Sequence, residues 1–291
     1  MYNIIDSFLY HCEAKGLSKK TIKSYNFALM KMAQHFETKG ITKIEDVKPT
    51  DIEQYIRTFN TQSKITVNGY IRDLKVFYSW ATDFEYLSRN PFKIKQHKVE
   101  RTPLPFVSDK DFKKLIQSMD KSRFPEYRDS VIVQTLLDTG MRIGETLSLK
   151  TFQINWHTNS ILLDGKDTKS KKPRTVFFGE KTRKLLRQWI KHRDLMIEET
   201  DFLFPNQFGK EFHINTFERN LRMYQARVGL SDITPKTFRN NFAKRFLLNG
   251  GDIFMLSKIL GHSSVSVTEK AYLDLTEEDI RKNYISPLEK M

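Results

Sequence analysis

The chain has 291 residues, and its 49 Lys and Arg against 35 Asp and Glu give a formal net charge of +14 at pH 7. A hydrophobic content of 39%, with 22 Phe but only 12 Gly and 9 Pro, is enough to bury cores, which excludes global disorder. No long uncharged apolar stretch is present, so a membrane span, which needs about 20 such residues, is not expected. The one cysteine, Cys12, excludes an internal disulfide and a cysteine-built metal site.

Residues 1–16 lack the basic start of a secretory signal and contain Asp6 and Glu13. Together with the lone cysteine, which fits a reducing compartment, this predicts a cytoplasmic protein. The excess positive charge is spread over both the first hundred residues and the remainder, which indicates a basic surface on each of two domains. Such surfaces favour a polyanionic partner, because neutralised phosphates release their condensed counterions.

The helical spacing of apolar residues in 1–92 predicts a bundle of four short helices joined by short connections. The third helix is expected to begin at a capping box formed by Thr50 and Glu53, and the fourth to span about residues 63–80. Asn90-Pro91 then interrupts the helical pattern. Apolar residues recur at helical spacing, in the second helix as Ile22, Tyr25, Leu29, Met32 and Phe36.

The basic, polar stretch 93–105 is bracketed by prolines and has no periodicity, so we expect a linker. Residues 106–291 then form a second domain, which begins with a helix capped at Ser108. Three short β-rich runs separated by polar turns predict a small antiparallel sheet, at residues 152–154, 161–163 and 175–178. The predicted fold class is mainly α, with a helical bundle, a linker and a mostly helical domain that carries this sheet.

Four local motifs in the second domain carry groups suited to phosphate chemistry. They are Thr139-Gly140-Met141-Arg142-Ile143-Gly144-Glu145, the basic hairpin 165–174, Thr234-Pro235-Lys236-Thr237-Phe238-Arg239, and Leu260-Gly261-His262 followed by Tyr272. Each motif alone is more often explained by a surface ion pair, a solvated turn or helix packing. Their order and their combined chemistry indicate a functional site.

This set resembles the tyrosine recombinase (phage integrase) family over nearly the whole chain. The family signatures are a T-G-x-R-x-x-E box, a β-hairpin lysine, an H-x-x-R box, an L-G-H box and a downstream tyrosine, and the sequence has them in that order. The pattern Gly16-Leu17-Ser18, Thr21-Ile22 and Tyr25 is similar to that of the family's helical, SAM-like core-binding domain. The resemblance implies a DNA-binding domain at 1–92, a linker at 93–105, and a catalytic domain with a C-terminal tail at 106–291.

The resemblance also implies a role for each motif. Arg142 and Arg239 would make charged hydrogen bonds to the non-bridging oxygens of a scissile phosphodiester, where charge develops during attack. His262 would add a further donor or a proton-transfer group, and Tyr272 would be the nucleophile that forms a 3′-phosphotyrosine. The ester keeps the bond energy, so rejoining needs neither ATP nor metal. The absence of a P-loop and of histidines at ligand spacing agrees with the expectation of no cofactor.

Lysines raise two questions of assignment. The hairpin lysine is expected to protonate the leaving 5′ oxygen as a general acid. The family's T-K-x-K-x-x-R-x-V pattern matches residues 168–176 without a gap and selects Lys169, whereas a G-K pattern found in other members selects Lys166. Lys236 stands where the family usually has the first histidine of H-x-x-R, and with a free pKa of about 10.4 it would act mainly as a phosphate donor.

Two other positions leave alternatives open. Glu145, three residues after Arg142, would orient the cations of the site or form an ordinary intrahelical ion pair. Tyr272 lies ten residues after His262, one more than the family spacing, but Tyr284 lies too far along to replace it.

Double-stranded DNA is the expected partner. Candidate phosphate contacts, for each of which a solvated surface charge is the alternative, are Lys64, Arg72, Lys75, Arg219, Arg222, Lys244 and Arg245. By resemblance, the tail 276–291 docks on a neighbouring protomer and couples the subunits of a homo-tetramer on two DNA duplexes. The alternative is a tail helix that packs on its own domain.

Three functions compete. The first is a site-specific recombinase, and the second is a catalytically impaired two-domain DNA-binding regulator, which Lys236 in a histidine position favours. The third, relaxation of supercoils by a related monomeric enzyme, is disfavoured by the N-terminal module and by a tail suited to assembly. Because the other chemical residues are all present, the sequence predicts the recombinase.

Overall fold

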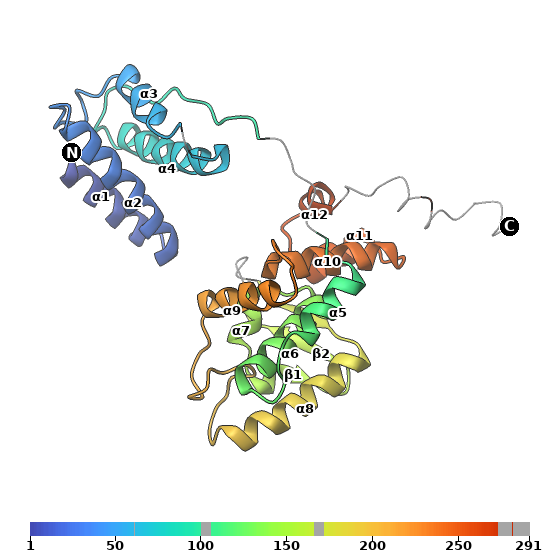
Figure 1. The fold of residues 1–291 in the computed structure, drawn as a ribbon. Coiled ribbons are helices and arrows are strands. Elements are labelled where there is room, and N and C mark those ends of the chain that lie inside the picture. Colours follow the sequence, from blue (N-terminus) through green and yellow to red (C-terminus); the bar gives the residue numbers. More distant parts are fainter. Residues whose placement is uncertain (61, 100–105, 166–171, 273–280, 282–291) are drawn as a thin grey trace. The chain divides into compact units, whose positions relative to one another are not determined.

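The computed structural model describes residues 1–60, 62–99, 106–165, 172–272 and 281 (Figure 1). The chain divides into two compact units, Met1–Thr102 and Pro103–Met291. Helices dominate both units, and a single small antiparallel sheet of three strands lies in the second unit within the described part of the chain. The predicted fold class is confirmed. None of the described helices is long and apolar enough to cross a membrane.

The first unit is the predicted four-helix bundle. Hydroxyls cap two of its helices, since Ser18 accepts from the backbone N–H of Thr21 and Ser63 from that of Thr66. Its core is rich in aromatic rings, among them Phe8, Phe36, Phe77 and Tyr78, which are at most 1% exposed. The helices are α1 (Tyr2–Ala14), α2 (Lys19–Glu37), α3 (Pro49–Arg57) and α4 (Lys64–Asp83).

The start of α3 differs from the prediction. Its first residue is Pro49, and the carboxylate of Asp51 accepts a hydrogen bond of 2.9 Å from the backbone N–H of Lys48. The proposed capping box at Thr50 and Glu53 is therefore wrong. Proline lacks an N–H and has a fixed φ, so it suits the first helical position, and the helix begins there.

The second unit is built around α6 (Phe124–Thr139), which is buried along most of its length. Helices α8 and α10 both pack against it. The predicted cap of the first helix is confirmed, since Ser108 accepts from the backbone N–H of Asp111. The other helices are α5 (Asp109–Gln117), α7 (Ile143–Ser148), α8 (Glu180–Met196), α9 (Ile214–Arg227), α10 (Pro235–Leu248), α11 (Ile253–Leu260) and α12 (Val265–Tyr272).

The sheet has the strand order β1 (Ile154–Asn155), β2 (Ser160–Leu163) and β3 (Arg174–Phe177). The pair Ile161 and Val176 faces the core, whereas Phe177 is 56% exposed. The first predicted run, 152–154, is mostly wrong, because Phe152 and Gln153 lie in a short 3₁₀ helix, Thr151–Gln153. The side chain of Gln153 accepts from the backbone N–H of Lys150 and closes that turn instead of extending the strand.

Two glycines stop helices directly before predicted site residues. Gly140 ends α6 with a φ of 64°, and Gly261 ends α11 with a φ of 63°. A left-handed conformation of this kind is readily adopted only by glycine. Gly140 is also covered by the ring of Phe242, because a Cβ added there would lie 2.3 Å from Phe242 Cδ1. Backbone conformation and close packing thus both fix the entry to the Arg142 segment.

This packing gives a stability prediction. Gly140→Ala is expected to lower the free energy of unfolding of the second unit by about 2–5 kcal/mol, because left-handed strain adds to the displacement of the Phe242 ring. Gly229→Ala is the matched control, since Gly229 has a φ of 66° with no atom within 4 Å of an added Cβ, and its cost is about 1–2 kcal/mol. Denaturant unfolding, followed by tryptophan fluorescence in a Trp80→Phe background, measures both. Equal losses in the two variants would contradict the packing argument.

Candidate active site

Residues from four distant segments of the second unit meet at one site. Arg142 and Glu145 come from the start of α7, Arg239 from α10, and His262 from the residues that follow α11. Arg174, the first residue of β3, joins them. The structure therefore brings together four of the predicted site residues and adds one cation that the prediction did not include.

A buried carboxylate organises the arginines. The Glu145 side chain is 2% exposed and accepts from Arg142 twice, from its backbone N–H at 2.9 Å and from Nη1 at 3.0 Å. Arg174 donates to both carboxylate oxygens, from Nη1 at 2.9 Å and from Nη2 at 2.6 Å. The ion pair at the start of α7 is thus also part of a bridge to strand β3.

The charge state of Glu145 follows from this pairing. Burial raises the pKa of the Glu145 carboxyl, but hydrogen bonding and the charge of Arg174, together with Arg142, outweigh burial and lower it below its ordinary value. The group is therefore an anion at neutral pH. Its two-oxygen contact with Arg174 is the planar, bidentate geometry that a guanidinium favours.

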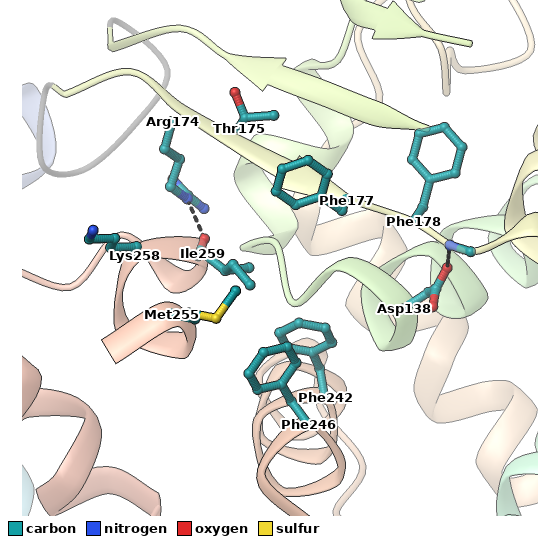
Figure 2. A pocket seen from close by; sticks show the side chains of 11 residues that line it. Asp138, Arg174, Thr175, Phe177, Phe178, Phe242, Phe246, Met255, Lys258 and Ile259 are labelled. Atoms are coloured by element: carbon teal, nitrogen blue, oxygen red, sulfur yellow. Dashed lines mark hydrogen bonds between the residues drawn. The ribbon is translucent and has the colours of Figure 1, made fainter. Parts of the chain in front are cut away.

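Arg174 also contacts the segment that carries His262. Its Nε donates to the backbone oxygen of Ile259 at 2.8 Å (Figure 2). A Cβ on Gly261 would lie 2.8 Å from Arg174 Cδ, so the glycine permits the close approach of this side chain. Arg174 was not among the predicted site residues. It lies two residues before the buried Val176 in a β-rich run, and residues two apart point to the same face of a strand. This spacing was the signal that could have placed Arg174 on the inner face of the sheet.

Arg239 is held by the ends of two helices. It is 7% exposed, and it donates from Nη1 to the backbone oxygen of Gly140 and from Nη2 to that of Leu260, both at 2.7 Å. Its Nη2 also lies 3.2 Å from Nε2 of His262. Carbonyl groups at helix C-termini carry partial negative charge, so both contacts favour the guanidinium. The orientation of Arg239 is thus fixed before any ligand arrives.

His262 lies in a strongly positive environment. Burial, followed by the charges of Arg239, Arg142 and Arg174, lowers the pKa of its imidazole to about 4. The ring is therefore neutral at pH 7. Three guanidiniums against the one carboxylate of Glu145 make this site suited to an anion, and planar guanidiniums suit phosphate oxygens in particular.

Some predicted site residues are not tested by these contacts. Lys169 and its alternative Lys166 lie outside the described residues, as does the tail 276–291 apart from Arg281. The backbone of Tyr272 is the last position of α12, and its side chain lies outside the described part. Lys236, in the first turn of α10, is exposed and makes no hydrogen bond or ion pair to the described residues.

The candidate DNA contacts fall into two groups. Five are exposed on helix surfaces, namely Lys64, Arg72, Lys75, Arg219 and Arg222, and two, Lys244 and Arg245, are half-buried. Three of the seven contact nearby residues of their own unit. Arg72 pairs with Asp73 at 3.1 Å, Arg245 pairs with Asp109 at 2.6 Å, and Lys244 lies over the ring of Phe106 at 5.1 Å.

An apolar hollow of about 720 Å³ lies beside the site (Figure 2). Figure 2 shows the rings of Phe242 and Phe246 on α10 near Met255 and Ile259 of α11, with Phe177 from β3 on another side. Lys258 also lines the hollow. Through Ile259 and Arg174 the hollow shares a wall with the cation cluster. The described residues contain no group of three or more His, Cys, Asp and Glu side chains suited to a metal ion.

The low pKa of His262 predicts a pH-dependent stability. The unfolded chain takes up a proton at this histidine near pH 6.5, whereas the folded chain does so only near pH 4. Between these values the unfolded state binds more protons, so acidification destabilises the fold. From pH 7 to pH 5 the wild type should lose more unfolding free energy than His262→Gln, as measured by denaturant titration at each pH. An identical pH dependence in the two proteins would contradict the low pKa.

Family models match both units of the chain. The family model described as "Phage integrase family" matches residues 105–279, and "Phage integrase, N-terminal SAM-like domain" matches residues 4–87. The tyrosine recombinase XerC of Staphylococcus aureus (strain USA300 / TCH1516) is 26% identical, with 98% of this chain and 96% of XerC covered.

Two solved structures are also similar to this chain. The crystal structure of XerA recombinase has a TM-score of 0.54 at 27% identity and 96% coverage of each chain. The Tn1549 transposon integrase in complex with a circular intermediate DNA has a TM-score of 0.76 at 18% identity and 99% coverage of each chain, a likeness of fold. From the family models, which together span most of its length, the chain belongs to the phage integrase family and is a tyrosine-type site-specific recombinase.

Proposed function

We propose that this recombinase cleaves and rejoins double-stranded DNA through a 3′-phosphotyrosine on Tyr272. The observation that carries the proposal is the convergence of Arg142, Arg239 and His262 on one site from separate segments. A phosphodiester would enter this site as the anion that the three guanidiniums favour. Residues 106–291 would be the catalytic domain, and residues 1–92 a core-binding domain that holds the DNA from its own surface.

In the proposed reaction, the phenolic oxygen of Tyr272 attacks phosphorus and the bond to the 5′ oxygen breaks. Arg142 and Arg239 donate hydrogen bonds to the non-bridging oxygens, where negative charge grows. Because Arg239 is already oriented by two backbone carbonyls, little reorganisation accompanies the reaction. Neutral His262 takes up the proton that the phenol of Tyr272 releases. Lys236, in the first turn of α10 where the family usually has a histidine, would donate to the phosphate.

A hairpin lysine completes the proton balance. Lys169, with Lys166 as the alternative, gives its proton to the leaving 5′ oxygen as the bond to phosphorus breaks. In the reverse step a 5′ hydroxyl attacks the phosphotyrosine and Tyr272 leaves. The ester holds the bond energy throughout, so rejoining consumes neither ATP nor a metal-bound nucleophile.

A nicked suicide substrate tests the chemistry, because loss of the short 5′ fragment traps the covalent adduct. Tyr272→Phe is expected to abolish the adduct, and Arg239→Ala to slow its formation by about 10²–10³-fold. Tyr284→Phe is the matched control and should react as the wild type does. Adduct formation by Tyr272→Phe would overturn the proposal. If Tyr284→Phe then formed no adduct, the nucleophile would be Tyr284.

A catalytically impaired DNA-binding regulator is the second candidate. The exposed Lys236 in place of a histidine is the observation that favours it. The same assay separates the two functions, because a regulator would bind the substrate and form no adduct with the wild-type chain. Phosphate contacts through the exposed Lys64, Lys75, Arg219 and Arg222 serve either function. Arg72, Lys244 and Arg245 also remain candidates for such contacts. DNA as substrate agrees with a cytoplasmic protein.

Assembly is the last part of the proposal. The active form is a homo-tetramer on two duplexes, in which the tail 276–291 of one protomer docks on the next. The apolar hollow beside the cation cluster supports this, because the tail sequence offers Ile280, Ile285 and Leu288. Lys258 at the hollow complements the acidic start of the tail, Glu277, Glu278 and Asp279.

A charge placed in the hollow tests this docking. Met255 lines the hollow and is 58% exposed, so Met255→Glu leaves the core intact but disfavours an apolar occupant. We expect the variant to bind DNA with near wild-type affinity and to lose the tetrameric complex in native gels and sedimentation. Leu195, near the end of α8, is 85% exposed. Leu195→Glu is therefore the control and should assemble normally. Normal assembly of Met255→Glu would rule out this hollow as the docking surface.

A further inference from the structure

Helix α12 packs beside α11 and α10, and one of its described polar side chains is fully buried. Among its described side chains, Val265–Glu269, only that of Thr268 is buried, with 0% exposure. Val267 is 44% exposed, and the hydrophobic clusters of the unit include no described residue of this helix. The Oγ1 atom of Thr268 lies 2.8 Å from Nδ1 of His262. Among the described side chains of α12, that of Thr268 thus joins the helix of Tyr272 to the cation cluster.

The partners of His262 determine which ring nitrogen carries the proton. Nε2 lies 3.2 Å from Nη2 of Arg239, and a guanidinium has donors only, so Nε2 accepts. In a neutral ring the proton is then on Nδ1, which donates to the hydroxyl oxygen of Thr268. The opposite tautomer would turn an N–H toward the N–H of Arg239 and leave Nδ1 as an acceptor. The lowered pKa of His262 agrees with a neutral ring.

We infer that Thr268 is a positioning residue of the site: by accepting the Nδ1 proton of His262 it keeps the Nε2 lone pair directed toward Arg239. The same hydrogen bond acts with the packing of α12 on α11 and α10 to hold that helix in place. Tyr272 is four residues further along, and positions four apart lie on the same face of a helix. The hydroxyl of Thr268 thus links the protonation state of the histidine to the position of the helix that bears the nucleophile. The inference rests on the proposed function of Tyr272 and His262.

Thr268→Val and Thr268→Ser separate this role from a structural one. Valine keeps the shape and β-branching of threonine but leaves Nδ1–H without its acceptor, so adduct formation should slow about 10- to 100-fold. Serine keeps the hydroxyl and loses a buried methyl group, so its adduct rate should stay within about threefold of wild type while thermal stability falls. Ser266→Val, at an exposed position of the same helix, should react as the wild type does.

A merely structural role would make the rates follow the measured stabilities of the two variants, and would allow Thr268→Ser to be slower than Thr268→Val. That order would overturn the inference, as would a wild-type rate for Thr268→Val. If the wild type itself forms no adduct, the proposed function fails, and the tautomer still tests the position of Thr268.

The tautomer is measured by nitrogen NMR on protein labelled with ¹⁵N-histidine. The chain has seven histidines, and the signals missing from His262→Gln identify those of His262. In the DNA-free wild type at pH 7 we expect a protonated Nδ1 and an unprotonated Nε2. In Thr268→Val this state should be less populated or in exchange, and it should persist in Thr268→Ser. A protonated Nε2 in the wild type would overturn the inference.

Discussion

The site depends on the buried carboxylate of Glu145. A lone buried charge is costly, but this one accepts from two arginines and from a backbone N–H, so its pairing is nearly complete. The carboxylate also permits two guanidiniums to lie close together without strong repulsion. One of them, Arg174, reaches onward to the backbone at Ile259. Strand β3, the start of α7 and the end of α11 are therefore held in one arrangement by a single charged centre.

Helix ends provide the second set of constraints. Helices α6 and α11 both stop at left-handed glycines, and their terminal carbonyls converge on Arg239. The guanidinium satisfies carbonyls that lack partners within their own helices. The same geometry makes it rigid, which matters in a site whose proposed work is to stabilise developing charge without rearrangement. Stability of the fold and orientation of the cation thus come from the same hydrogen bonds.

The positive field of the site acts on the histidine as well as on any ligand. Burial, together with the charges of three arginines, keeps His262 neutral, whereas an isolated imidazole would be partly protonated near pH 6.5. Such a site has unused capacity for negative charge, and a phosphodiester is an anion of suitable geometry. The neutral histidine keeps one ring lone pair, on Nε2, which faces Arg239. An anion site and a neutral histidine thus occur together in one charge distribution, which Glu145 balances only in part.

The sequence by itself determined what depends on neighbours along the chain. Hydrophobic spacing, serine caps and turn-forming residues specified the helices and β2 and β3, and the order of short motifs specified the family. Local reasoning failed where two local signals competed, at Pro49 against Thr50 and at the turn closed by Gln153. Arg142, Glu145, Arg239 and His262, which the short motifs singled out, lie in one cluster.

Only the tertiary structure decided how those motifs are held. Arg239 and Gly140 are 99 positions apart, and Arg174 and Glu145 are 29 apart, so their hydrogen bonds have no periodic signature. The role of Arg174 and the contact of Thr268 with His262 became visible only once the chain had folded back on itself. A side chain's local pattern reveals which face of its element is buried. The partner it meets there is set by the packing of other elements, and that packing is a property of the whole domain.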